Sequence, residues 1–305
     1  MRILSIGNSF SSDATRWLHE LSVAGGKPIE TVNLYIGGCS LKQHALNALD
    51  NLPAYLLEVN GEAIREGVSL NDTLRDGEYD AVTLQQVSSA SGLVTSYTPY
   101  ADQLAKLIRQ EQPNAKLYVH QTWAYDEDCQ EELFVAYNRS QSMMYKKLEQ
   151  AYDLMAMSLD IPIIPTGDLI QELRESPYFA KEGAVPSSYD ENEELPPFPA
   201  GSDDAAAPPS LTRDGYHLNL YYGRYAAACL WYAVLTRSPS AGVDWLPPAP
   251  VQQPKNHELK PEVWEFIRET ADRLARENTD YKSEQIGEVP DIEAIPGSNL
   301  PDHLK

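Results

Sequence analysis

The chain has 305 residues, 42% of them hydrophobic, and a formal net charge of −21. This length is enough for one large α/β core with appendages, and the negative charge argues against nucleic acid or an anionic membrane as a partner, because both would repel it. No run approaches the roughly eighteen apolar residues of a membrane span, and the N-terminus lacks the apolar segment of a secretory signal, so we expect a cytoplasmic protein.

Strand-like and helical patterns alternate along the first half of the chain. Short apolar runs that are typical of buried strands recur at residues 2–6, 30–36, 80–84, 115–120 and 161–164. Helical spacing of apolar residues follows each of them, at about 12–24, 40–52, 97–112, 129–158 and 166–175. This alternation predicts a three-layer α/β/α fold with a central, mostly parallel five-stranded sheet. Asn60-Gly61 is a hairpin signal, which predicts a small β-hairpin excursion at 55–70.

The second half holds an irregular segment and two further helices. Residues 183–210 mix Pro and Ala with acidic runs, and both a flexible surface insertion and a lid over a nearby site fit this composition. A broadly apolar helix at 219–236 closes the main domain, which we expect to span residues 1–236. Residues 237–305 are expected to form a Pro-rich connector, an amphipathic helix near 261–277 and a polar tail, packed on or extending from the same domain.

Residues that commonly bind metals or form disulfides are scattered. The cysteines Cys39, Cys129 and Cys229 lie far apart without a C-x-x-C pair, which predicts reduced thiols. The six histidines show neither H-x-H nor H-E-x-x-H spacing. We therefore expect no metal and no cofactor. The sequence leaves the oligomeric state open, a homo-oligomer included.

The first predicted strand stops at a serine. Gly7-Asn8-Ser9 follows the apolar run, and cap residues and helical spacing come directly after it. A serine at a strand-to-helix turn is typical of the nucleophile of an α/β enzyme, because the turn lifts the hydroxyl out of the sheet and gathers amide N–H groups beside it. The same residues also make ordinary turns, so the signal is weak alone.

A second signal lies two hundred residues further on, in Asp214-x-x-His217. With this spacing, one turn of backbone can bring the carboxylate to the imidazole Nδ1–H and leave Nε2 free to take a proton from a serine. The alternative is a helix cap with a half-exposed histidine. The combination favours a Ser9–His217–Asp214 triad, with the last two residues opening the final helix of the sheet domain.

These motifs resemble the SGNH (GDSL-type) hydrolases. Gly7-Asn8-Ser9-Phe10 is similar to their first block, with Asn8 where many members carry Asp, and Gly37-Gly38 is similar to the second. Asp214-x-x-His217 resembles the fifth block. Over about residues 1–236 the sequence is similar to a poorly characterised bacterial branch of this superfamily. The resemblance implies an SGNH/flavodoxin-like fold, with Ser9, Asp214 and His217 catalytic and with the N–H groups of Ser9 and Gly38 in the oxyanion hole.

One block departs from the family pattern. The third block normally supplies an Asn side chain to the oxyanion hole, but here the strand runs into Gln85-Gln86-Val87-Ser88. An amide N–H of Gln85 or Gln86, or the Ser88 hydroxyl, could replace it. A missing donor can cost on the order of a hundredfold in turnover.

Four residues are candidate substrate contacts. His120 ends a strand, and strand ends line the crevice of such a sheet; Trp123 and Tyr125 follow it and could either pack or form a platform for a sugar ring. Asn8, beside Ser9, is the fourth. We expect a serine ester hydrolase that removes a short acyl group, with acetyl the leading candidate, from a carbohydrate or similar small polar substrate. The alternatives are lipase-like or thioesterase activity, or a silent carbohydrate-binding protein.

Overall fold

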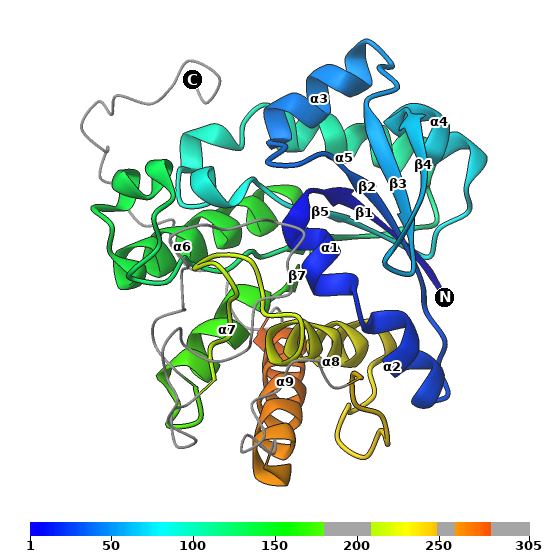
Figure 1. Ribbon diagram of the computed structural model, residues 1–305. Coiled ribbons are helices and arrows are strands. Elements are labelled where there is room, and N and C mark those ends of the chain that lie inside the picture. The colour runs from blue at the N-terminus through cyan, green and yellow to red at the C-terminus, as the bar shows by residue number, and fades with distance from the viewer. Residues whose placement is uncertain (180–208, 249–259, 282–305) are drawn as a thin grey trace.

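A seven-stranded sheet forms the middle of the protein, in the order β4-β3-β2-β1-β5-β6-β7 (Figure 1). The computed structural model describes residues 1–179, 209–248 and 260–281. The strands are β1 Arg2–Gly7, β2 Glu30–Tyr35, β3 Tyr55–Val59, β4 Glu62–Val68, β5 Ala81–Leu84, β6 Lys116–His120 and β7 Ile163–Ile164. Strands β2, β1, β5, β6 and β7 are parallel, and they match the five predicted runs.

The predicted hairpin is part of the sheet, so the expected count of five strands was too low. β3 pairs antiparallel with β2, and β4 pairs antiparallel with β3, which extends the sheet to seven strands. Asn60 and Gly61 have φ of 51° and 78°, the left-handed conformation that a two-residue hairpin turn requires. The fold class predicted from the sequence is confirmed, and the sheet has two further strands at one edge.

Helices cover both faces of the sheet and give it three layers (Figure 1). They are α1 Ser9–Thr15, α2 Leu18–Ala24, α3 Leu41–Leu49, α4 Leu70–Asp76, α5 Tyr100–Glu111, α6 Gln141–Leu159, α7 Thr166–Glu175, α8 Tyr222–Thr236 and α9 Pro261–Tyr281. α8 contacts α1, α2 and α7, whereas α5 contacts α3, α4 and α6. β1 lies between these layers, and its side chains Ile3, Leu4 and Ile6 are fully buried.

Two helix predictions were wrong in their bounds. The expected helix at 12–24 is two helices, α1 and α2, which meet at Arg16 and Trp17. The expected helix at 129–158 begins only at Gln141, where Ser140 caps it by accepting the Met143 N–H; a short 3₁₀ segment, Glu132–Tyr137, precedes it. Short helices such as α4, which was not predicted, carry too few turns for a clear period.

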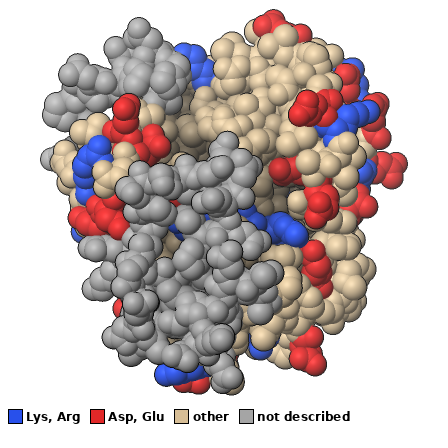
Figure 2. Space-filling view, in the orientation of Figure 1, with Lys and Arg blue, Asp and Glu red and all other residues tan. Residues whose placement is uncertain are grey.

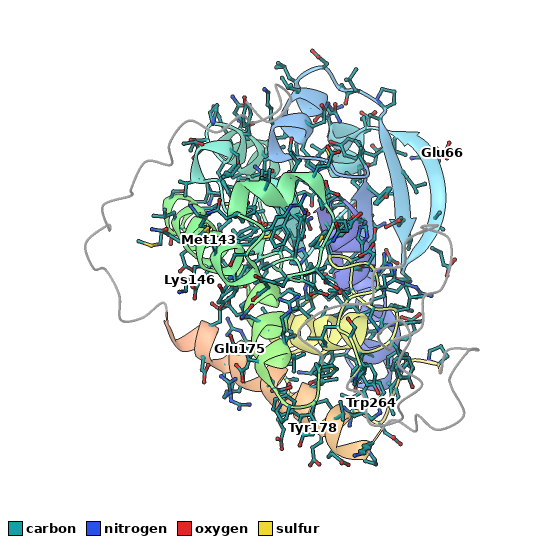
Figure 3. The ribbon with its side chains drawn as sticks, turned by 60° about the vertical axis from the view of Figure 1, so that its left-hand side comes forward. Glu66, Met143, Lys146, Glu175, Tyr178 and Trp264 are labelled. Atoms are coloured by element: carbon teal, nitrogen blue, oxygen red, sulfur yellow. The ribbon has the colours of Figure 1, made fainter. Side chains whose placement is uncertain are left out.

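α9 packs along α8. Trp264 stacks on Tyr222 with ring centroids 4.8 Å apart, and Phe266 contacts Tyr178 at 5.0 Å. Figure 3 shows Trp264 and Tyr178 at the same end of the molecule. The amphipathic helix expected near 261–277 is therefore present and buries its apolar side. The insertion predicted at 183–210 lies almost wholly outside the described residues, as do most of the connector and the tail.

Acidic residues dominate the charged surface. Figure 2 shows Asp and Glu side chains among fewer Lys and Arg on the visible face, as the net charge of −21 requires. All three cysteines are buried and free. Within the described ranges, no helix is long and apolar enough to cross a bilayer, and no group of three His, Cys, Asp or Glu side chains could hold a metal ion.

Candidate active site

The strand-to-helix turn predicted at Ser9 is present at the end of the central strand β1. Asn8 is the N-cap of α1 in extended conformation, and its Oδ1 accepts the Phe10 N–H at 3.0 Å. Ser9 is thus the first residue of α1. At Gly7 a Cβ atom would collide with Ser11 and lie 3.0 Å from the Gln85 side chain, so the turn requires glycine there.

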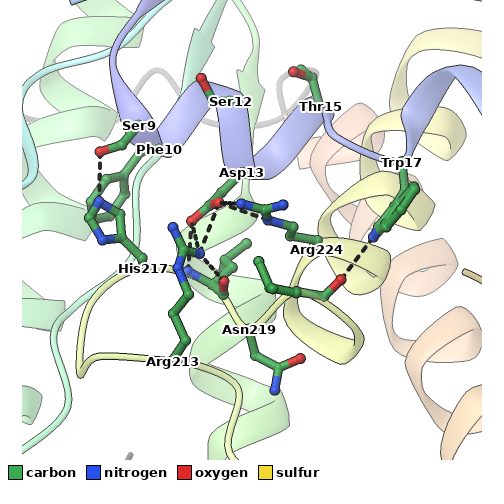
Figure 4. Close-up of polar contacts among 12 residues, drawn as sticks. Ser9, Phe10, Ser12, Asp13, Thr15, Trp17, Arg213, His217, Asn219 and Arg224 are labelled. Carbon is green, nitrogen blue, oxygen red and sulfur yellow. Dashed lines mark hydrogen bonds and ion pairs between the residues drawn. The ribbon is translucent and has the colours of Figure 1, made fainter. Parts of the chain in front are cut away.

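Ser9, His217 and Asp214 form a hydrogen-bonded row. His217 Nε2 lies 2.8 Å from Ser9 Oγ (Figure 4), and His217 Nδ1 lies 2.6 Å from Asp214 Oδ2. Asp214 Oδ1 also accepts the His217 N–H at 2.7 Å. The Asp214 side chain is 3% exposed and that of His217 14%. The carboxylate therefore holds one ring nitrogen, and the other faces the serine hydroxyl.

Asp214 and His217 lie in a short hairpin-like loop, residues 211–219, which we name the triad loop. Thr212 and Leu218 form an antiparallel bridge, and the Arg213 N–H donates to the His217 carbonyl at 2.9 Å. Gly215, at φ +91°, makes the turn. The prediction that Asp-x-x-His opens a helix was wrong, because α8 begins only at Tyr222.

A buried ion pair fixes one side of the triad loop. Arg174 of α7 and Asp126, which follows β6, pair at 2.6 Å with side-chain exposures of 4% and 3%. Asp126 Oδ2 accepts a hydrogen bond from the Thr212 hydroxyl, and the Asp126 N–H donates to the Gly215 carbonyl at 2.7 Å. These contacts tie the triad loop to the carboxyl end of β6.

The second glycine motif lies beside the Gly7-Asn8-Ser9 turn. Gly38 is exposed with φ +62°, and the next residue, Cys39, accepts a hydrogen bond from Asn8 Nδ2 at 3.1 Å. In the described part of the chain, the N–H groups of Ser9 and Gly38 donate to no protein acceptor. Asn8 is 1% exposed and its amide bonds Cys39, Phe10 and Gln85 inside the protein, which corrects its assignment as a substrate contact.

The two glutamines after β5 do not supply an oxyanion donor in the predicted way. Gln86 Nε2 donates to both the carbonyl and the hydroxyl of Ser96, at 2.9 Å each, so both its amide hydrogens are used. Gln85 Nε2 donates to Asn8 Oδ1 at 2.8 Å. The Ser88 hydroxyl bonds the Tyr125 hydroxyl at 2.9 Å. Gln85 therefore stabilises the Gly7-Asn8-Ser9 turn through Asn8.

His120 continues this chain and is fully buried. Its Nδ1 lies 2.8 Å from Gln85 Oε1, an acceptor, so Nδ1 carries the proton. Burial lowers the pKa of His120 to about 3, which keeps the ring neutral. The prediction that His120 contacts substrate was wrong; it orients Gln85, which orients Asn8.

The predicted sugar platform was also wrong, because both of its rings lie inside the protein. Trp123 stacks on Phe10 with centroids 4.3 Å apart, and its indole N–H donates to the Tyr216 carbonyl at 2.6 Å. Tyr125 is 2% exposed. The half-buried aromatic residue beside the site is Tyr216, whose ring lies 4.2 Å from that of His217. Its place between Asp214 and His217 was the signal that sequence reasoning missed.

The three-layer fold, with a mostly parallel sheet, a serine turn after β1 and an Asp-x-x-His loop late in the chain, is of the SGNH/flavodoxin-like α/β type. A protein from Slackia heliotrinireducens, provisionally described as an SGNH hydrolase, has this fold at a TM-score of 0.50 and 17% identity, over 77% of this chain and 98% of that one.

The chain belongs to the DUF4886 family, a domain of unknown function, which matches residues 2–202 and 199–251. A DUF4886 protein from Bacteroides uniformis is similar in structure, at a TM-score of 0.73 and 31% identity, over 90% of this chain and 94% of that one. A search of curated proteins finds no match.

Proposed function

We propose that the protein is a serine ester hydrolase that uses Ser9, His217 and Asp214. The observation that carries the proposal is the pair of contacts of His217, 2.8 Å to the Ser9 hydroxyl and 2.6 Å to the Asp214 carboxylate. Asp214 fixes the tautomer with the proton on Nδ1, so that Nε2 can act as a base toward Ser9.

The reaction follows from these roles. Ser9 Oγ attacks the ester carbonyl while His217 Nε2 takes its proton. The N–H groups of Ser9 and Gly38 bind the resulting oxyanion, because neither is bonded to protein among the described residues. His217 then returns the proton to the leaving alcohol as the C–O bond breaks. A water molecule, deprotonated by His217, cleaves the acyl-serine and regenerates the hydroxyl.

The substrate we propose is a short acyl ester, with acetyl the leading candidate, on a carbohydrate. Behind Ser9 the Phe10 and Trp123 rings stack on each other at 4.3 Å, so a long acyl chain would have to displace this pair to enter the core there. Tyr216 lies half-buried next to His217, where an aromatic ring can contact the apolar face of a sugar.

A fluorophosphonate probe followed by peptide mapping tests the mechanism, because it reacts with an activated serine. We expect labelling at Ser9, and none in Ser9→Ala. Hydrolysis of p-nitrophenyl esters of increasing chain length, alongside acetylated oligosaccharides, tests the substrate. A preference for octanoyl over acetyl esters would favour a lipase-like enzyme over a carbohydrate esterase. A protein that binds sugars but is not labelled by the probe would be a carbohydrate-binding protein without esterase activity.

A further inference from the structure

Asp13 is a buried carboxylate four residues after Ser9. Residues four apart in a helix lie one turn apart on the same side, and Figure 4 shows Ser9 and Asp13 on α1 facing the triad loop. Asp13 is 1% exposed. The proposed chemistry assigns it no role, and an ionised group is costly to bury without partners.

Three residues donate to Asp13, and two of them belong to the triad loop. Arg213 Nη1 lies 3.0 Å from both carboxylate oxygens, and the Leu218 N–H donates to Oδ2 at 2.8 Å. The third donor is Arg224 Nε on α8, at 2.8 Å from Oδ1. Arg213 also donates to the Leu218 carbonyl, which closes the loop on itself.

The charges keep this cluster ionised. Burial alone would raise the pKa of Asp13, but the guanidinium groups of Arg213 and Arg224 outweigh burial and hold the pKa below its usual value. Breaking one partner of such a cluster leaves a buried charge uncompensated. The triad loop therefore has one favoured attachment to α1.

We propose that Asp13 is the positioning residue that sets the separation between Ser9 and His217. The Leu218 N–H that Asp13 holds belongs to the residue next to His217. The contact between Ser9 Oγ and His217 Nε2 crosses from α1 to the triad loop, whereas the contact between His217 and Asp214 lies within the loop. Loss of the Asp13 charge weakens the first contact and spares the second.

The test compares Asp13→Asn with a matched buried carboxylate elsewhere. Asp272 on α9 is 4% exposed and accepts hydrogen bonds from the Ser240 N–H, the Ser240 hydroxyl and the Ala241 N–H, at 2.7, 2.8 and 2.9 Å. Because displacement of about 1 Å can cost a hundredfold, we expect fluorophosphonate to label Ser9 about a hundredfold more slowly in Asp13→Asn. Asp272→Asn should stay within about threefold of wild type, because its partners Ser240 and Ala241 follow the C-terminal end of α8, whereas the triad loop precedes the N-terminal end.

A second readout separates positioning from general damage. The proton between His217 Nδ1 and Asp214 gives a downfield NMR resonance, which should persist in Asp13→Asn because that hydrogen bond lies inside the triad loop. If Asp13→Asn does not fold, Arg213→Gln takes its place, since it keeps the ion pair between Asp13 and Arg224. We expect about tenfold slower labelling for Arg213→Gln, with the resonance retained.

Two results would overturn the inference. One is labelling of the folded variant, Asp13→Asn or its replacement, at the wild-type rate. The other is loss of the downfield resonance together with labelling, which would mean that the whole triad loop is disrupted. The inference rests on the proposed function, and a wild-type protein that is not labelled at Ser9 would overturn that function itself, so the two failures are distinguishable.

Discussion

Gln85 and Asn8 are bonded side chain to side chain, Nε2 to Oδ1, at 2.8 Å beneath the nucleophile turn. The orientation of both amides is fixed, because Asn8 Oδ1 also accepts the Phe10 N–H and Gln85 Oε1 faces His120 Nδ1. Asn8 Nδ2 in turn holds the Cys39 carbonyl next to Gly38. The amide chain therefore couples the two loops that supply the proposed oxyanion donors.

Gln85→Ala should lower kcat by about tenfold to a hundredfold with little change in KM, because Asn8 and the Gly38 loop lose their support. It should also destabilise the fold by about 1–3 kcal/mol, since it leaves the buried His120 Nδ1–H without an acceptor. Gln112→Ala is the control: this amide also bridges two groups, the Tyr79 N–H and the Gly77 carbonyl, but these are backbone groups outside the Ser9 site. Equal kcat losses in both variants would contradict the positioning role of Gln85.

Ser9→Ala should remove nearly all esterase activity and leave the unfolding midpoint close to that of wild type, because the hydroxyl contacts His217 and packs little. His217→Ala should be as damaging, and Asp214→Ala less so. The wild-type rate should rise with pH, because a general base acts in its unprotonated form. Steady-state kinetics from pH 5 to 8 measure this, and a flat profile would argue against a histidine base.

The buried histidines His44 and His120 should each contribute a loss of stability in mild acid. Burial lowers the pKa of His120 and of His44 to about 3, from an ordinary 6.5. Between these values only the unfolded chain takes up the protons, so this stability is present above pH 6.5 and is lost as the pH falls toward 3. At pH 5 the loss is about 2 kcal/mol for each histidine.

Urea unfolding at pH 7.5 and pH 5 measures that loss. His120→Gln removes one titrating group and can still donate a hydrogen bond to Gln85, so its stability should fall about 2 kcal/mol less between the two pH values than that of wild type. An unchanged pH dependence in this variant would mean that His120 is protonated in the folded protein.

Trp123→Ala should mainly lower stability, whereas Tyr216→Ala should mainly raise KM for a sugar ester. Removing Trp123 leaves a cavity beside Phe10 and should cost about 3–5 kcal/mol of stability. Tyr216→Ala should change stability less and should raise KM for an acetylated oligosaccharide more than for p-nitrophenyl acetate, which has no sugar to contact. Calorimetry and kinetics on both substrates compare the two, and equal KM changes on both esters would remove Tyr216 from sugar binding.

The parallel part of the fold could be predicted because each strand carries its own apolar run. The hairpin was different: Asn60-Gly61 predicts the turn, but pairing of β3 with β2 depends on contacts such as that between Val32 and Val59, which no local pattern encodes. A helix that starts at Ser9 and breaks at Trp17 was also hidden, since each half has only two turns.

Some residues of the candidate site could likewise be predicted from local motifs, whereas others depend on how the strands pair. Ser9, Asp214 and His217 stand in local motifs, so their positions could be predicted from the sequence. Gln85 and Gln86 are neighbours on an extended chain, where successive side chains point to opposite sides, and which one faces Asn8 depends on the register of β1 and β5. Asp13 could have been found from the sequence, because it lies four residues after Ser9 and therefore one helical turn away on the same side of the helix.

The side chains of Asn8, Gln85 and His120 run crosswise over the ends of β1, β5 and β6, three adjacent strands at the centre of the sheet. The amides of such strands are the last to exchange with solvent, because they open only when the whole domain unfolds. On heating, activity and tertiary structure should therefore disappear in one transition. The Ser9 turn should therefore unfold together with the central strands and not before them.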